Sequence, residues 1–404
     1  MSSRRTTTPA QGVVTLIPAL DGLRAVAAGM VVLTHAAYLT GVGVGSGLTG
    51  RMMARGDFGV AIFFALSGFL LHRGLVADDR DGRLDVVGYA FRRAARILPA
   101  YWIALAVVVV ASHPSARDSL IHAAGLQIYW SDAWISDFGQ SWSIATEIAF
   151  YAALPFVVLA LRPLRRRRPA LPLIVLAILA VALTLTSGLG GGGAFGEDVL
   201  YERWLHARAP HFLVGMICAE ALLVPGHAIA RRLTSWGSDA VMCLAVAGAA
   251  YLMATAPITG SLTLEPATPS QLVVRTALSA VIALGLLLPL THGGPSAYRA
   301  VLSRPVVRWL GVTSYGLFLW HLPVFEALYA VTGASEFAGG LLPLLAVGLP
   351  ISLLLAALSH HWIEVPSSRL AGRLLARRRQ RQRDRPEDKE SHRPLDSGAS
   401  DSAR

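Results

Sequence analysis

The sequence predicts an all-α polytopic membrane protein with about ten transmembrane helices. Of its 404 residues, 54% are hydrophobic and only 15% are charged, whereas soluble domains carry about 25% charged residues. The apolar residues fall in runs that can cross a bilayer, which takes about 20 mostly apolar residues per helix. Arg-rich and acidic loops alternate between the runs. The net charge of +11 is therefore explained by the positive-inside rule and by attraction to anionic lipid, and it does not indicate nucleic-acid binding.

Ten spans follow a polar leader, residues 1–16, for which we expect disorder. They belong to one membrane domain, residues 17–370. The polar residues 371–404 have no apolar periodicity, so we expect a disordered cytoplasmic tail there. The expected spans are residues 17–39, 57–75, 95–112, 142–161, 171–189, 208–224, 239–256, 270–290, 309–330 and 341–362.

Arginine content alternates from loop to loop. The loops around Arg80, Arg166 and Arg231 are rich in arginine, and those between them are poorer in it. The positive-inside rule then places both termini in the cytoplasm of a multi-pass protein of the inner (plasma) membrane. The first outer loop is an exception because it holds Arg51 and Arg55.

The first span, Pro18–Thr40, carries Asp21, Arg24 and His35. Ionisable groups inside a span are costly and usually face the interior of the bundle. Arg24 and His35 are eleven residues apart, which returns to nearly the same helix face and covers roughly 16 Å. The simpler interpretation is that Arg24 snorkels to the headgroups and His35 is a satisfied core residue. The alternative is that both belong to one site.

Other polar residues have comparable depths in later spans. Counting along the helices places Glu147 and His321 in the same outer layer as His35, and His211 near the outer end of its span. Imidazoles beside a carboxylate suit general acid–base chemistry. The open alternatives are a proton relay in a transporter, or interhelical hydrogen bonds that only hold the bundle.

A second group of charges gathers at the opposite surface. Arg93 and Arg96 share a helix face and lie at the same membrane side as Arg24. Guanidinium groups bind phosphate oxygens in bidentate fashion, so this group suits a phosphorylated ligand. Asp21 is expected to pair with Arg24 and orient it. For the neighbouring Arg92, topology alone is the better explanation.

Other patterns carry less weight. His113 and Asp118 form a His-x4-Asp pattern, but it lies in a polar outer loop. Cys218 and Cys243 both fall inside expected spans and form neither a disulfide framework nor a metal-binding set.

Six stretches together resemble the acyltransferase family 3 membrane proteins, which O-acylate surface polysaccharides, glycolipids and some macrolides. They occur in the family's order from residue 20 to residue 370. They are LDGLRAVAAGMVVLTH (Leu20–His35), FGVAIFFALSGFLL (Phe58–Leu71), RRAARILPAYW (Arg92–Trp102), WSIATEIAFYAALP (Trp142–Pro155), WLGVTSYGLFLWHLPV (Trp309–Val324) and HHWIEVPSSRL (His360–Leu370).

The resemblance implies a single-domain O-acyltransferase with a cytoplasmic acyl-CoA donor, expected to be acetyl-CoA, and no permanently bound cofactor or metal. The acceptor would be a hydroxyl of a sugar, glycolipid, polysaccharide or macrolide. The residues that match family motifs are Arg24 with His35, Arg93 with Arg96, Trp142 and Ser143 with Glu147, and Tyr315 with His321.

On this view the arginines hold the CoA, and its thin arm extends toward His35. His35 would remove the acceptor proton or briefly accept the acyl group. Glu147 or His321 would orient the imidazole. Direct transfer and an acyl-histidine intermediate both stay open. The competing classes are a proton-coupled transporter or flippase that uses the same His and Glu residues, and a structural membrane protein.

Overall fold

The computed structural model describes residues 17–189, 201–260 and 267–383, and every regular element in these ranges is helical. Each of the ten expected spans corresponds to a helix. These are α1 (Ala19–Leu39), α4 (Gly59–Arg80), α5 (Val86–Ser112), α7 (Trp142–Arg167), α8 (Leu171–Thr186), α9 (Leu205–Ala221), α11 (Ala240–Met253), α12 (Pro269–Thr291), α15 (Ser314–Thr332) and α16 (Leu341–Ser359). The predicted leader, residues 1–16, lies outside the described residues.

Shorter elements connect these helices. The α-helices among them are α2 (Val42–Gly45), α3 (Gly47–Ala54), α6 (Ala116–Ala123), α10 (Ala228–Ser238), α13 (Ala297–Leu302), α14 (Pro305–Val312) and α17 (Val365–Arg383). The 3-10 turns are η1 (Arg55–Phe58), η2 (Gln127–Tyr129), η3 (Ser131–Ala133), η4 (Ser136–Ser141), η6 (Tyr201–Arg203) and η7 (Pro257–Thr259), and a π-helical turn, η8 (His360–Glu364), joins α16 to α17.

Seven helical stretches in the described part of the chain are long and apolar enough to cross a membrane. An eighth is added if α10 and α11, which meet at a 90° bend, form one broken span. Helices α9, with 17 residues, and α15 are not among them. The protein is therefore a multi-pass membrane protein, while the crossing of all ten helices and the side on which the termini lie stay predictions.

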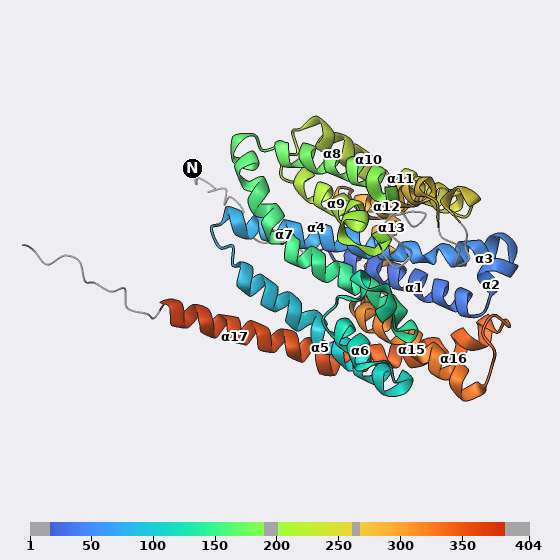
Figure 1. Cartoon of the computed structure of the whole chain (residues 1–404). Coiled ribbons are helices and arrows are strands. Elements are labelled where there is room, and N and C mark those ends of the chain that lie inside the picture. The colour runs from blue at the N-terminus through green and yellow to red at the C-terminus, as the bar shows by residue number, and fades with distance from the viewer. Residues whose placement is uncertain (1–16, 190–200, 261–266, 384–404) are drawn as a thin grey trace, which may run out of the picture.

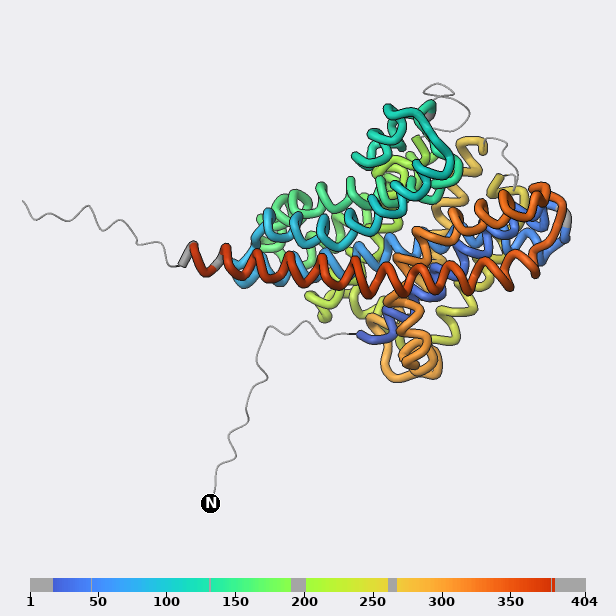
Figure 2. The backbone as a smooth tube through the Cα atoms, turned by 90° about the horizontal axis from the view of Figure 1, so that it is seen from below, coloured from blue at the N-terminus to red at the C-terminus, as the bar shows by residue number. Residues whose placement is uncertain are grey.

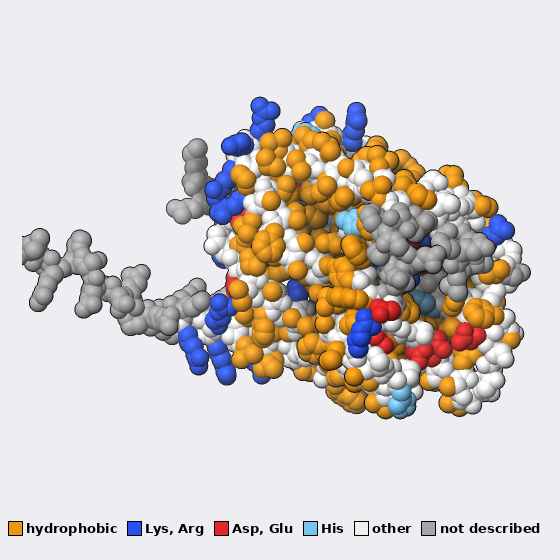
Figure 3. Space-filling model, in the orientation of Figure 1, with side chains coloured by type: hydrophobic (Ala, Val, Ile, Leu, Met, Phe, Trp, Pro, Cys, Tyr) orange, Lys and Arg blue, Asp and Glu red, His pale blue; other side chains and the backbone are white. Residues whose placement is uncertain are grey.

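The long helices run alongside one another in one bundle, and α17 projects from one end (Figure 1). Figure 3 shows hydrophobic side chains over the middle of the visible face and many Arg side chains at the end from which α17 projects. Helix α8 is apolar almost all round, and Ile178, Val181 and Leu185 are exposed on it. Such a belt is what a lipid-facing surface requires.

Helices α4 and α9 approach more closely than ordinary side chains permit. A Cβ atom on Gly68 would overlap the carbonyl of Phe212, and one on Gly215 would overlap the carbonyl of Ala65. Small residues at helix contacts let backbones approach in membrane proteins, where packing rather than the hydrophobic effect drives association. This contact fixes Phe64 and Ser67 of α4 against α9.

An ion cluster joins α4, α7 and α9 nearer the arginine-rich end. Glu220 accepts hydrogen bonds from Nε2 of His72 (2.7 Å) and from Arg165 (2.5 Å). All three side chains are buried. A buried carboxylate needs such partners because an unpaired charge in a low-dielectric interior is very costly.

The prediction of disorder from residue 371 is wrong as far as residue 383. Helix α17 continues to Arg383 and packs on α5 (Figure 2). Ala371 and Leu375, four residues apart on one helix face, are buried, at 2% and 8% exposed. This short apolar stripe gives the arginine-rich helix a docking face. Residues 384–404 lie outside the described part.

The exceptional Arg55 of the first outer loop has a structural role. It is 2% exposed and donates hydrogen bonds to the carbonyls of Ala254 (2.8 Å) and Gly260 (2.8 Å) and to the hydroxyl of Thr259 (2.9 Å). Because it closes the turn after α11 and does not face the headgroups, Arg55 does not contradict the predicted topology.

Reporter fusions can test that topology. Because arginine-rich loops are retained in the cytoplasm, fusions at Arg80, Arg166 and Arg231 are expected to give cytoplasmic signals. A fusion near Asp132 is expected to give an external signal. Paired alkaline phosphatase and fluorescent-protein reporters would measure both sides. An external signal at Arg166 would contradict the ten-span arrangement.

Candidate active site

The two predicted histidines lie in contact with each other. Nε2 of His321 on α15 is 3.0 Å from Nδ1 of His35 on α1, and the ring centroids are 5.0 Å apart. His321 is fully buried, whereas His35 is partly buried. The sequence counts that placed these residues at one depth therefore correspond to a real juxtaposition.

The contacts of the pair favour one assignment of protons to its nitrogens. Nδ1 of His321 is 2.9 Å from the carbonyl of Leu317, and Nδ1 of His35 is 2.9 Å from the carbonyl of Val31. Carbonyl oxygens only accept, so both Nδ1 atoms carry hydrogen. The one hydrogen on Nδ1 of His35 is then shared between the carbonyl of Val31 and Nε2 of His321. Nε2 of His35 is left unprotonated, with no hydrogen bond in the described part of the chain and open to its surroundings.

A cavity of about 270 Å³ contains the predicted arginine cluster. Arg24 of α1 and Arg93 and Arg96 of α5 line it, and Arg96 is exposed at its mouth. None of the three forms an ion pair or side-chain hydrogen bond within the described residues, and Nε of Arg93 is buried without a partner. Unpaired guanidinium groups around one cavity favour an anionic ligand. We call this space the arginine cavity.

Glu147 lies in the arginine cavity and not beside the histidines. Its Oε1 accepts hydrogen bonds from the hydroxyls of Ser67 (2.6 Å) and Tyr151 (2.5 Å). No hydrogen bond joins it to His35 or His321 among the described residues. Glu147 therefore does not contact the histidines although its predicted depth is similar to theirs. The side chain that contacts His35 is His321.

A second cavity, of about 140 Å³, lies next to the first, and we call it the outer cavity. Val60 and Phe64 line both spaces, so they form the wall between them. Phe64 stacks on Phe212 with ring centroids 4.3 Å apart, and Phe212 stacks on Phe150 at 3.9 Å. The charged and polar residues that line the outer cavity are Asp57, Glu202, Arg203, Arg208, His211, Arg275 and Ser279, together with Trp142.

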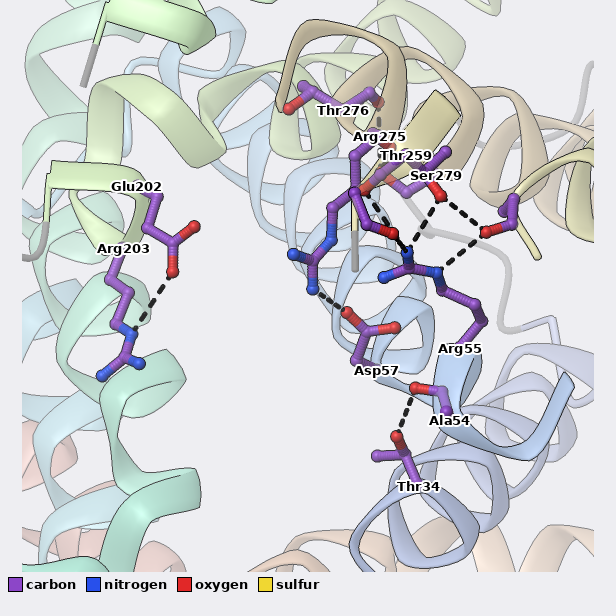
Figure 4. Close-up of polar contacts among 12 residues, drawn as sticks. Thr34, Ala54, Arg55, Asp57, Glu202, Arg203, Thr259, Arg275, Thr276 and Ser279 are labelled. Atoms are coloured by element: carbon purple, nitrogen blue, oxygen red, sulfur yellow. Dashed lines mark hydrogen bonds and ion pairs between the residues drawn. The ribbon is translucent and has the colours of Figure 1, made fainter. Parts of the chain in front are cut away.

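Neither histidine of the pair lines either cavity, although neighbouring residues connect the pair to both. The hydroxyl of Thr34, the residue before His35, donates to the carbonyl of Ala54 (2.6 Å), three residues before Asp57 (Figure 4). On the other side, the ring of His321 is 6.0 Å from Phe318, which lines the arginine cavity. The pair therefore packs against one lining residue of the arginine cavity, Phe318, and is linked to the outer cavity through the turn that precedes Asp57.

A family model described as an acyltransferase domain, family 3, matches residues 17–361. The chain belongs to this acyltransferase family. It is 26% identical over 374 residues to the peptidoglycan O-acetyltransferase OatA of Listeria monocytogenes, covering 87% of this chain and 55% of that protein. It is 28% identical over 384 residues to the putative peptidoglycan O-acetyltransferase YrhL of Bacillus subtilis, covering 90% of this chain and 56% of the relative.

The chain thus spans about half the length of the curated relatives it matches. The O-acetyltransferase OatA of Staphylococcus aureus is 24% identical over 375 residues, covering 87% of this chain and 57% of that protein. No solved structure matches the chain.

The remaining family-motif residues lie around the two cavities. Ser143 lines the arginine cavity and donates to the carbonyl of Gln140 (3.3 Å). Tyr315 lines it too, and its hydroxyl donates to the carbonyl of Ile97 (2.8 Å). Trp142 instead lines the outer cavity, beneath the guanidinium of Arg208 (4.9 Å). Their roles stay predictions.

Two expectations about individual residues need revision. The pairing of Asp21 with Arg24 is wrong: Asp21 forms its ion pair with Arg308 (3.6 Å), because α14 packs against the start of α1. His211 lies in the outer cavity and hydrogen-bonds the hydroxyl of Ser279 (2.7 Å), so it does not join the pair of His35 and His321.

Sequence reasoning missed Asp57 and Arg275 of the outer cavity, which form an ion pair. A signal for Arg275 was present, because it is a charge within an otherwise apolar run of α12. Ser67 and Tyr151, the partners of Glu147, carried no comparable signal.

Proposed function

We propose that this protein is a membrane O-acyltransferase that moves an acetyl group from cytoplasmic acetyl-CoA to a hydroxyl of a cell-envelope carbohydrate. The observation that carries the proposal is the free Nε2 of His35. A histidine whose Nδ1–H is held by Val31 and His321 presents the other nitrogen as a base in one fixed direction.

The arginine cavity is the proposed donor site. The phosphates of CoA would lie against Arg24, Arg93 and Arg96, which lack ion-pair partners of their own in the described chain. The thin pantetheine arm is of the same order of length as the roughly 16 Å between residues 24 and 35 of one helix. The thioester would then lie near the wall formed by Val60 and Phe64.

In the proposed reaction, Nε2 of His35 takes the proton of the acceptor hydroxyl as its oxygen attacks the thioester carbonyl. The C–S bond breaks, and the leaving thiolate receives that proton from the imidazolium to give free CoA. The hydrogen bond to Nε2 of His321 stabilises the imidazolium while it exists. A route through an acyl-histidine would begin at the same nitrogen, with Nε2 as nucleophile.

The acceptor class rests on similarity. Two of the relatives named above act on peptidoglycan according to their names, which makes peptidoglycan the first carbohydrate to test. The wider set expected from the family resemblance, which includes glycolipids, other polysaccharides and macrolides, stays open to the same assay.

The test is a transfer assay with purified protein in lipid nanodiscs. Acetyl-CoA with a radiolabelled acetyl group is supplied with peptidoglycan fragments, other envelope glycans or no acceptor. We expect free CoA to be released and label to appear on a glycan, and both to require the acceptor. If proteoliposomes instead show proton-coupled solute movement without acetyl-CoA consumption, the protein is a transporter and the proposal is wrong.

A further inference from the structure

The charged residues of the outer cavity come from four separate parts of the chain and take no part in the proton transfer described above. Asp57 comes from η1, Glu202 and Arg203 from η6, Arg208 from α9 and Arg275 from α12. Figure 4 shows Glu202 and Arg203 on one side of the view and Asp57 and Arg275 on the other. Such an assembly of charges inside an apolar bundle marks a site for a polar ligand.

Two of its three arginines have carboxylate partners. Arg275 forms an ion pair with Asp57. Nε of Arg203 is 3.9 Å from Glu202, and its guanidinium lies 4.2 Å from the centre of the Trp134 ring. With three arginines and two carboxylates among the described lining residues, the cavity holds an excess of positive charge.

Arg208 carries that excess. Its Nε donates to the carbonyl of Glu202 (2.7 Å), and its guanidinium lies over Trp142. These contacts fix the orientation of the Arg208 guanidinium, yet no carboxylate in the described chain lies within ion-pair distance of it. Its two terminal nitrogens have no hydrogen-bond partner there and are not sealed from the cavity. A fixed guanidinium with its terminal N–H groups free is suited to a carboxylate or phosphate.

A second polar group of the same cavity also lacks a hydrogen-bond partner, and it indicates a ligand with hydroxyl groups. Oδ1 of Asp57 is buried without a hydrogen-bond partner, although Oδ2 is paired with Arg275. Nε of Arg275 is buried without a partner as well, so this ion pair leaves one acceptor and one donor that a ligand with hydroxyl groups can satisfy. A ligand that pairs with Arg208 and also hydrogen-bonds the ion pair of Asp57 and Arg275 carries an anionic group and a hydroxyl.

We propose that the outer cavity binds an acidic sugar unit of the acceptor, with Arg208 holding its carboxylate or phosphate and Asp57 accepting one of its hydroxyls. This inference rests on the proposed function, because it places the acceptor on the far side of Phe64 from the donor. It adds that the acceptor bears a negative charge close to the hydroxyl that is acylated.

Binding of three probes to the protein in nanodiscs tests the inference. The probes are glucuronate, glucose 6-phosphate and neutral methyl glucoside, measured by ligand-observed NMR with acetyl-CoA titrated separately. We expect at least one acidic sugar to bind more tightly than methyl glucoside. Arg208→Gln is expected to weaken that acidic sugar by about 10- to 100-fold, the usual range for a lost charge-assisted hydrogen bond, and to leave acetyl-CoA affinity unchanged.

Two further variants make the result decisive. Arg208→Lys keeps the charge, so it should retain most of the phosphate binding even if the glutamine variant unfolds. Arg51→Gln removes an exposed arginine of the same outer loop region and should bind as the wild type does. Equal binding of neutral and acidic sugars, absence of sugar binding, or equal losses in Arg51→Gln and Arg208→Gln would each overturn the inference.

The two proposals fail in different ways. If acetyl-CoA is consumed but acidic sugars do not bind, the outer-cavity inference is wrong and the proposed function stands. If acidic sugars bind through Arg208 but no acetyl group is transferred from acetyl-CoA, the proposed function is wrong.

Discussion

His35→Gln is expected to lower the turnover number by about 10²- to 10⁴-fold, the usual cost of losing a general base. Glutamine can keep a hydrogen bond to His321, but its amide cannot take a proton near neutral pH. The variant should still insert in the membrane, remain monodisperse and bind acetyl-CoA with wild-type affinity. Single-turnover transfer and acetyl-CoA titration on the same preparation would separate chemistry from binding.

His113→Asn is a matched control, because His113 is exposed, forms no side-chain hydrogen bond in the described chain and has a positive φ that asparagine tolerates. It should behave as the wild type. His321→Gln should lower the turnover number without changing the KM for acetyl-CoA, since His321 positions His35. If His35→Gln retains more than about a tenth of wild-type turnover, the loss is below a general-base effect, and the role of base moves to His321.

Removing an arginine from the arginine cavity should have the next largest effect. Arg24→Ala and Arg93→Ala are each expected to weaken acetyl-CoA binding by about 10- to 100-fold, as for the loss of a charge-assisted contact. Arg96→Ala should cost less, because Arg96 is exposed at the mouth and water screens its charge. Calorimetric titration of acetyl-CoA into nanodisc samples measures all three.

Arg92 supplies the control for this series. It is adjacent to Arg93 in the chain but does not line the cavity. Arg92→Ala should therefore bind acetyl-CoA as the wild type does. Equal losses in Arg92→Ala and Arg93→Ala would mean that the arginines attract anions only through their general positive field. Unaltered affinity in Arg24→Ala and Arg93→Ala together would exclude the donor site.

The helical architecture could be predicted because long apolar runs allow little else in a bilayer. The arginine cluster was also accessible, since Arg93 and Arg96 share a face of one helix and Arg24 lies on the same predicted side. The meeting of His35 with His321 agreed with a count of depth along two helices. In each case the position of a residue along the axis of its helix was enough to predict which residues lie at the same depth.

Rotation of one helix about its axis relative to another was not accessible from the sequence. Glu147 has the depth expected of a partner for His35, yet it faces the arginine cavity because α7 packs with that side toward Ser67 of α4. The outer cavity escaped prediction for the same reason. Asp57 and Arg275 are 218 residues apart, and no local pattern indicates that α12 brings them together.

The stacked rings of Phe64, Phe212 and Phe150 also bear on the electrical insulation of the membrane. Each elementary charge that leaks across a membrane held at 100 mV dissipates about 2.3 kcal/mol. An enzyme that reaches a donor from one side and an acceptor from the other would let ions leak across the membrane if water connected its two cavities. Because Phe64 is only 2% exposed and, like Val60, lines both cavities, the residues that the two cavities share are apolar. A small uncharged acetyl group can be handed across such a boundary, whereas a hydrated proton is held back.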